Sequence, residues 1–226
     1  MAKKTLGSLL LCSALVMSAI PAEAHVSVIP GVSAAGNTSD AVTVGKNNTL
    51  MFRVGHGCSL EKDVLHPTTG KVVAAKDTWK GDTSVFSVTV PAVALGEAGT
   101  TAPRPAFVPG WKTTIKLNDD KTQTVTWTAI SRDFALPNGP SGDVATTTYF
   151  DFGLRVSFAK AAAGTTVTFP ARQTCHVDVP AVKATKGQRA IKARILNVFE
   201  TWDGTTSDTV LDNDSRSTAP SIKVNN

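Results

Sequence analysis

Polar and apolar residues alternate along much of this chain, in stretches rich in valine, isoleucine and threonine. A period of two puts every second side chain on the same face, which is the pattern of a half-buried β-strand. Turn-forming runs such as GKNN, NDDK and LPNGPSGD separate these stretches. Short strands joined by turns predict one all-β domain, an antiparallel β-sandwich of immunoglobulin-like or fibronectin III-like type. The predicted strands lie within residues 41–54, 83–91, 112–118, 122–130, 149–159 and 165–171.

The sequence also predicts the structure of three further segments. The stretch 187–202, GQRAIKARILNVFETW, fits a helix or a strand, and its alternating apolar residues favour a strand. The segment 91–111 is rich in proline, alanine and glycine, so we expect a long surface connection. Residues 207–226 are polar and nearly free of aromatic side chains, which predicts a mobile tail after a sandwich domain of residues 25–206.

The first 24 residues have the features of a secretory signal peptide. Lys3 and Lys4 precede an apolar run that is too short to span a bilayer, and Ala22-Glu23-Ala24 supplies the small-x-small pattern of a cleavage site. We therefore expect export to the periplasm or the extracellular space, with His25 as the first residue of the mature protein. No later stretch is apolar over the roughly 20 residues that a membrane helix needs, so membrane contact is expected only through protein partners.

Charge and cysteine content narrow the function classes. The mature chain keeps 21 basic and 17 acidic residues, and the basic ones form no dense cluster with interleaved aromatic residues, which argues against nucleic-acid binding. Cys58 and Cys175 are the cysteines left after cleavage, and neither belongs to a CxxC pair of the kind that binds zinc. Because export places them in an oxidising compartment, we expect one disulfide between them.

A histidine at the first position of a chain offers two nitrogen ligands from one residue. The α-amine and ring Nδ1 can close a chelate ring around a metal ion, and the α-amine gives up its proton readily because its ordinary pKa is about 7.7 to 8.0. Nitrogen ligands in a plane favour copper(II), which also leads the divalent affinity series. His25 is therefore a candidate copper ligand of the histidine-brace type. The alternative is a chain end that carries a histidine by chance.

The sequence resembles the YcnI-like family of exported bacterial proteins over most of the mature chain. The order and spacing of the matching segments make the resemblance specific. It implies an immunoglobulin-like β-sandwich whose N-terminal histidine binds copper(II) in a one-histidine brace, completed by an acidic side chain and a tryptophan. The matching segments are AHVSVIP at 24–30, FRVGHGC at 52–58, RPAFVPGW at 104–111, VTWTA at 125–129 and GTTVTFPARQTC at 164–175.

His25 is the ligand that the resemblance carries over directly. The family's site tryptophan follows the Gln-x-Cys segment, and Trp202, in VFETW, is the candidate here, with Glu200 beside it as a possible carboxylate. The acidic ligand of the family lies near the position of HGC in this chain, so His56 is a second candidate. His176 follows Cys175 directly, and the expected disulfide would hold it close to His56.

The function that follows is copper trafficking or homeostasis, as a chaperone or scavenger and not as an enzyme. The implied partners are the copper ion and either a copper transporter or a second periplasmic copper chaperone. An enzymatic alternative is a copper-dependent polysaccharide monooxygenase, which normally adds a second histidine and an axial aromatic side chain; Tyr149 is the chain's single tyrosine. A third alternative is a structural or adhesive sandwich without metal.

Overall fold

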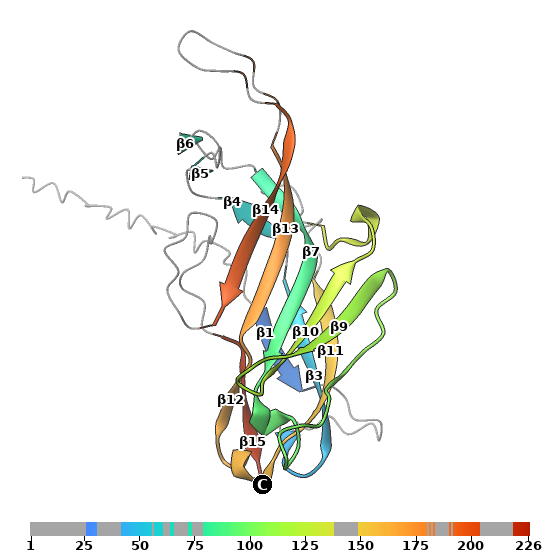
Figure 1. The fold of residues 1–226 in the computed structure, drawn as a ribbon, viewed down its shortest axis with the longest axis vertical. Helices are drawn as coiled ribbons and strands as arrows, with labels where there is room; N and C mark the ends of the chain where they lie inside the picture. Colours follow the sequence, from blue (N-terminus) through green and yellow to red (C-terminus); the bar gives the residue numbers. More distant parts are fainter. Residues whose placement is uncertain are drawn as a thin grey trace, which may run out of the picture.

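The computed structural model describes residues 26–30, 42–55, 57–60, 64–65, 72–73, 79–137, 149–179, 181, 183, 190, 192–203 and 219–226. Within these ranges the chain forms β-strands and short 3-10 turns, and no α-helix. Figure 1 shows the strands stacked along one long axis, with β12 and β15 at the end that carries the C-terminus and β5 and β6 at the opposite end. The described residues include no helix long and apolar enough to cross a membrane.

One layer of the sandwich is a sheet with the strand order β1-β3-β11-β8. All its pairs are antiparallel. The alternation in the sequence decides which face turns inward: Leu50, Phe52 and Val54 are buried, whereas the residues between them are only half-buried. Its strands are β1 (Val26–Pro30), β3 (Asn47–Val54), β8 (Arg104–Pro105) and β11 (Phe150–Ser157).

The second layer has the strand order β14-β13-β7-β10-β9, with β4 paired to β7 beside this path. These pairs are antiparallel as well. The strands are β4 (Cys58–Leu60), β7 (Trp79–Val90), β9 (Trp111–Leu117), β10 (Gln123–Ala129), β13 (Ala171–Val179) and β14 (Arg194–Trp202).

A smaller sheet joins the C-terminus to the rest of the fold. β15 (Ser221–Asn225) lies between β12 (Thr166–Thr168), to which it is antiparallel, and β2 (Val42–Thr43), to which it is parallel. β5 (Val64–Leu65) and β6 (Val72–Val73) form a separate pair. Short 3-10 turns occur at Ala92–Ala94, Arg132–Phe134 and Lys160–Ala162.

Aromatic rings fill the space between the two layers. Phe152 of β11 packs against Phe86 of β7 and Trp127 of β10, with ring centroids 4.8 and 5.3 Å apart. Trp111 meets the edge of the Phe152 ring at 5.1 Å. Both tryptophans therefore anchor the core, as large aromatic side chains in a sandwich of this size are expected to do.

The predicted all-β antiparallel sandwich is confirmed, and so is the strand predicted within 187–202, which is β14. Two expectations are wrong in part. The connection 91–111 is not wholly a surface segment, because it contributes β8 to a sheet and buries Leu95 and Val108. The predicted mobile tail 207–226 contains β15, which buries Ile222 and Val224, since alternation over so short a stretch is easily hidden by its polar neighbours.

Candidate functional site

The structure describes some of the predicted site residues and not others. Glu200 and Trp202 lie on β14, in the second layer. His25 and His56 lie outside the described residues, as does His66. Within the described part of the chain, no three histidine, cysteine, aspartate or glutamate side chains gather as a metal site would require.

Glu200 and Trp202 occupy successive inward positions at the end of β14. The exposed fractions of the two residues are 4% and 1%. Their partners on β13 are Gln173, opposite Glu200, and Ala171, opposite Trp202. A carboxyl group in such a position costs free energy unless it is hydrogen-bonded, paired with a cation or bound to a metal. The fold must therefore stabilise the carboxyl group of Glu200 inside the sandwich.

The chain enters the sandwich across from this strand. Phe52 of β3 packs on Phe169, two residues before β13, with ring centroids 5.5 Å apart, so β3 faces β13. β1 is the next strand beyond β3 in one layer, and β14 is the next strand beyond β13 in the other. The two edge strands therefore face each other. Val26, the first residue of β1, is buried and stands opposite Val54.

The predicted disulfide between Cys58 and Cys175 is present, with the two Cα atoms 5.8 Å apart. Cys58 opens β4 shortly after β3 ends at Val54, and Cys175 lies in the middle of β13. The bond therefore joins two strands of the second layer, β4 and β13, both of which pair with β7 at Gly81.

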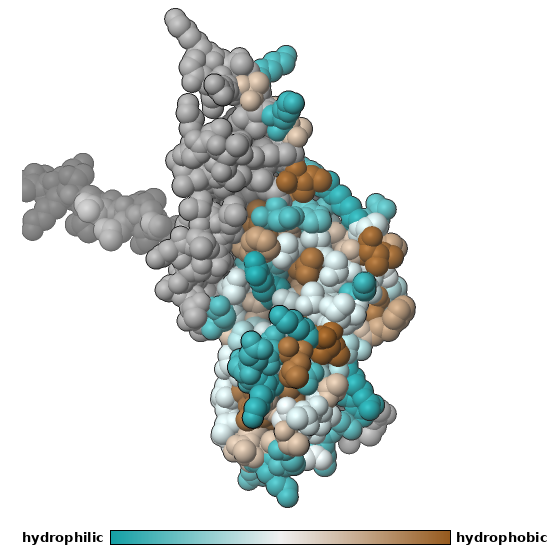
Figure 2. Space-filling view, viewed as in Figure 1, coloured by the Kyte–Doolittle hydropathy of each residue, from teal (hydrophilic) through white to brown (hydrophobic). Residues whose placement is uncertain are grey.

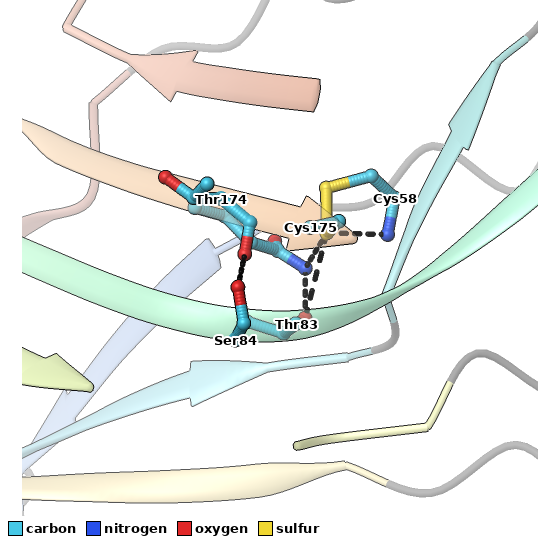
Figure 3. Close-up of a disulfide and its surroundings, with 6 residues drawn as sticks. Cys58, Thr83, Ser84, Thr174 and Cys175 are labelled. Carbon is cyan, nitrogen blue, oxygen red and sulfur yellow. Dashed lines mark hydrogen bonds between the residues drawn. A yellow bond between two sulfur atoms is a disulfide. The ribbon is translucent and has the colours of Figure 1, made fainter. Parts of the chain in front are cut away.

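Polar side chains line the interior beside this disulfide (Figure 3). Gln173 Nε2 donates a hydrogen bond to Thr83 Oγ1 at 2.5 Å and lies 3.6 Å from Cys175 Sγ. The backbone N–H of Cys58 donates to Cys175 Sγ at 2.9 Å. Gln173 and Thr83 are fully buried. Neither residue stood out in the sequence as a site residue, although Gln173 lies two residues before Cys175 and so shares its face of the strand.

His176 lies on the opposite face of β13 from the disulfide. Its neighbours Cys175 and Val177 are buried, whereas His176 itself is half-buried. Its backbone partners are Asp82 on β7 and Asn197 on β14. A strand alternates its side chains, so His176 points away from the buried disulfide. The expectation that the disulfide holds His176 close to His56 stays a prediction, because His56 lies outside the described residues.

An exposed ion pair lies near His176 on this outer face. Arg132 binds both carboxylate oxygens of Asp178 and lies 3.7 Å from a carboxylate oxygen of Asp82. The hydrogen bonds from Arg132, assisted by its charge, hold the pKa of Asp178 below its ordinary value. This group fastens the turn after β10 to β13 and has no part in the interior site.

Tyr149, the aromatic candidate of the enzymatic alternative, lies just before β11 and is exposed. The guanidinium carbon of Arg53 stands over its ring, 4.1 Å from the centroid. Arg53 in turn binds Asp151 through two hydrogen bonds of 2.8 Å. These contacts hold the tyrosine on the outer surface, away from Glu200 and Trp202.

No family model and no curated protein matches this chain. Among solved structures, an uncharacterized protein from Nocardia farcinica, described as having an immunoglobulin-like fold, is 18% identical. The match covers 89% of this chain and 99% of that chain, with a TM-score of 0.47. Because this TM-score is below 0.5, we assign the fold from the strand pairings of this chain itself.

Proposed function

We propose that this chain is a YcnI-like exported protein that binds one copper(II) ion through the α-amine and imidazole of His25. The observation that carries the proposal is the burial of Glu200, with Trp202 beside it, on the edge strand that faces β1. β1 begins at Val26, one residue after the proposed ligand. In this proposal, the α-amine and imidazole of His25 reach the part of the sandwich that holds the buried Glu200 carboxyl group.

The donor set fits copper(II). An amine and an imidazole supply nitrogen ligands, and a carboxylate supplies an oxygen ligand with negative charge. Burial of Glu200 is compatible with metal coordination, which is one of the ways in which a buried charge is stabilised. Trp202 would contribute an apolar wall beside the ion. His56 stays a second candidate ligand on sequence grounds, since it precedes the anchored Cys58 by two residues.

The proposed role is copper trafficking or scavenging in the periplasm or outside the cell, after removal of residues 1–24. The interior position of Glu200 favours storage and transfer over catalysis on a polymer, which needs an exposed binding face. Tyr149, the aromatic candidate of the enzymatic alternative, is held by Arg53 on the outer surface and so lies apart from the buried Glu200 and Trp202. The proposed recipient or donor of the ion is a copper transporter or a second copper chaperone.

Electron paramagnetic resonance on protein that begins at His25 tests the proposal. The control is the same protein with one alanine added before His25, which moves the α-amine away from the imidazole. We expect an equimolar, nitrogen-coordinated copper(II) signal that the added alanine abolishes or reshapes. Equal binding by both proteins, or by neither, would contradict the brace. Oxidation of a polysaccharide by the copper-loaded protein in the presence of a reductant would instead favour the enzymatic alternative.

A further inference from the structure

The turn that joins the two layers carries a fully displayed aromatic side chain. Residues 106–110 connect β8 of one sheet to β9 of the other, and Phe107 is 88% exposed. The next residue, Val108, is buried and anchors the turn in the core. Prolines at 105 and 109 restrict the backbone on either side. Phe107 is therefore presented to solvent on a stiff support, at the edge of the sandwich.

Two more exposed apolar side chains gather at this turn. The N–H of Ile130 donates to Gly110 O at 2.9 Å, and the ring of Phe134 lies where a side chain at residue 110 would stand. Gly110 also has a φ of +79°, so it suits both the turn and the close ring. Phe107, Ile130 and Phe134 form what we call the Phe107 patch. Figure 2 shows hydrophobic groups in brown on the side where β9 and β10 meet.

Cations flank the Phe107 patch. Arg104 and Arg155 stand directly opposite each other in the β8–β11 pair, an arrangement of like charges that is unfavourable by itself. Lys112 lies just beyond the turn, on β9. Among the described residues, none of these three cations forms an ion pair. Asp133, next to Phe134, offsets one of the three charges, so the surroundings of the patch stay positive.

We propose that the Phe107 patch docks on the surface of a bilayer that contains anionic phospholipid. Exposed aromatic and aliphatic side chains enter the boundary between headgroups and acyl chains, while neighbouring arginine and lysine side chains bind the anionic headgroups. The like-charged pair Arg104–Arg155 gains a counter-charge in this arrangement. A protruding side chain on a stiff turn suits a fluid surface, which can close around it, better than a protein partner, which would need a matching pocket.

The docked orientation leaves the proposed copper site free. β8 and β1 are opposite edges of the same sheet, so the Phe107 patch and the start of the mature chain lie on opposite sides of the sandwich. Membrane docking and copper binding are therefore independent properties. Loss of one is not expected to affect the other.

Vesicle flotation with the mature protein tests the proposal. We expect binding to vesicles of phosphatidylglycerol mixed with phosphatidylcholine, and much weaker binding to pure phosphatidylcholine vesicles. Phe107→Ala should weaken binding about tenfold, because a large apolar side chain no longer enters the boundary. Arg104→Gln and Arg155→Gln should each weaken it about fivefold and reduce its sensitivity to salt.

Ile195→Ser is the matched control, because Ile195 is exposed to 58% but lies on β14, at the opposite edge of the other sheet. Its binding should equal that of the unmodified protein. Circular dichroism should show the same fold for every variant, since all these side chains are exposed. Absence of binding to anionic vesicles at low salt, or equal loss in Phe107→Ala and Ile195→Ser, would overturn the proposal.

Discussion

Glu200 and Gln173 lie directly opposite each other in the β13–β14 pair, and both side chains are buried between the two sheets. They interrupt an inner face that is otherwise made of Ala171, Cys175, Val177, Val198 and Trp202. Burying a carboxyl group and an amide costs free energy that their hydrogen bonds must offset, and Gln173 donates one of these to Thr83. The edge strand β1 of the first layer faces this part of β14.

Replacing Glu200 by glutamine should weaken copper(II) binding while the fold is kept. Glutamine has nearly the same shape but lacks the negative charge that a cation prefers. We expect an affinity loss of about tenfold or more, the scale on which groups around a metal site act. A competition titration with a copper chelator measures it. The control is Glu97→Gln, because Glu97 is exposed and accepts a hydrogen bond from the N–H of Lys160. Equal affinities in both variants would remove Glu200 from the ligand set.

Removing the disulfide should destabilise the protein strongly. Cys58 and Cys175 are separated by 117 positions, and closing so long a loop restricts the unfolded chain. We expect the Cys58→Ala/Cys175→Ala double variant to lose about 2–5 kcal/mol in the free energy of unfolding, measured by urea denaturation. Adding a reductant should lower the stability of the unmodified protein and leave the double variant unchanged. A reductant effect on the double variant would mean that the disulfide is not the cause.

Phe152 should be among the most costly side chains to truncate. It is fully buried and packs against the rings of Phe86, Trp111, Trp127 and Phe150. Phe152→Ala leaves a cavity at the centre of this cluster, and we expect a loss of about 3–5 kcal/mol in unfolding free energy. The matched control is Phe107→Ala, the same change at an exposed position, which should stay within about 0.5 kcal/mol. Similar losses in the two variants would contradict this description of the core.

The alternation of polar and apolar residues made the sandwich predictable. Strands such as β3 and β10 bury every second residue, so apolar residues recur in the sequence with a period of two. The disulfide was predicted because two cysteines remain after the expected cleavage, in a chain that we expect to be exported. Gln173 could not be predicted as a buried residue in this way, because a polar residue at an inward position interrupts the alternation of polar and apolar residues. Its role depends on Thr83, which lies 90 positions away and reaches it only through the pairing of β7 with β13.

The C-terminal strand should contribute to stability although its surroundings in the sequence are polar. Ile222 is buried where β15 lies between β12 and β2, and both partners are remote in sequence. We expect Ile222→Ala to lower the free energy of unfolding by about 2 kcal/mol or more. Lys223→Ala, at the neighbouring exposed position, is the control and should have little effect. Equal thermal unfolding curves for the two variants would show that β15 is dispensable.

The pair of Arg132 and Asp178 should give a small stability contribution that disappears in acid. The hydrogen bonds from Arg132 lower the pKa of Asp178 in the folded protein relative to its ordinary value of 3.8. A lowered pKa means that the folded state favours the ionised carboxylate, so the contribution is complete above the ordinary value and is lost as the pH falls through the folded one. Because both side chains are about half exposed, the contribution should be at most about 1 kcal/mol.

Asp178→Asn removes this contribution. Urea denaturation should therefore find the variant less stable than the unmodified protein at neutral pH, with the difference shrinking as the pH falls below 3.8. Added salt should shrink the difference at neutral pH as well, because the pair is open to solvent. Asp133→Asn changes an exposed carboxylate that has no ion pair among the described residues, so its effect on stability should depend little on salt. A difference for Asp178→Asn that persists unchanged in acid would mean that its charge does not stabilise the fold.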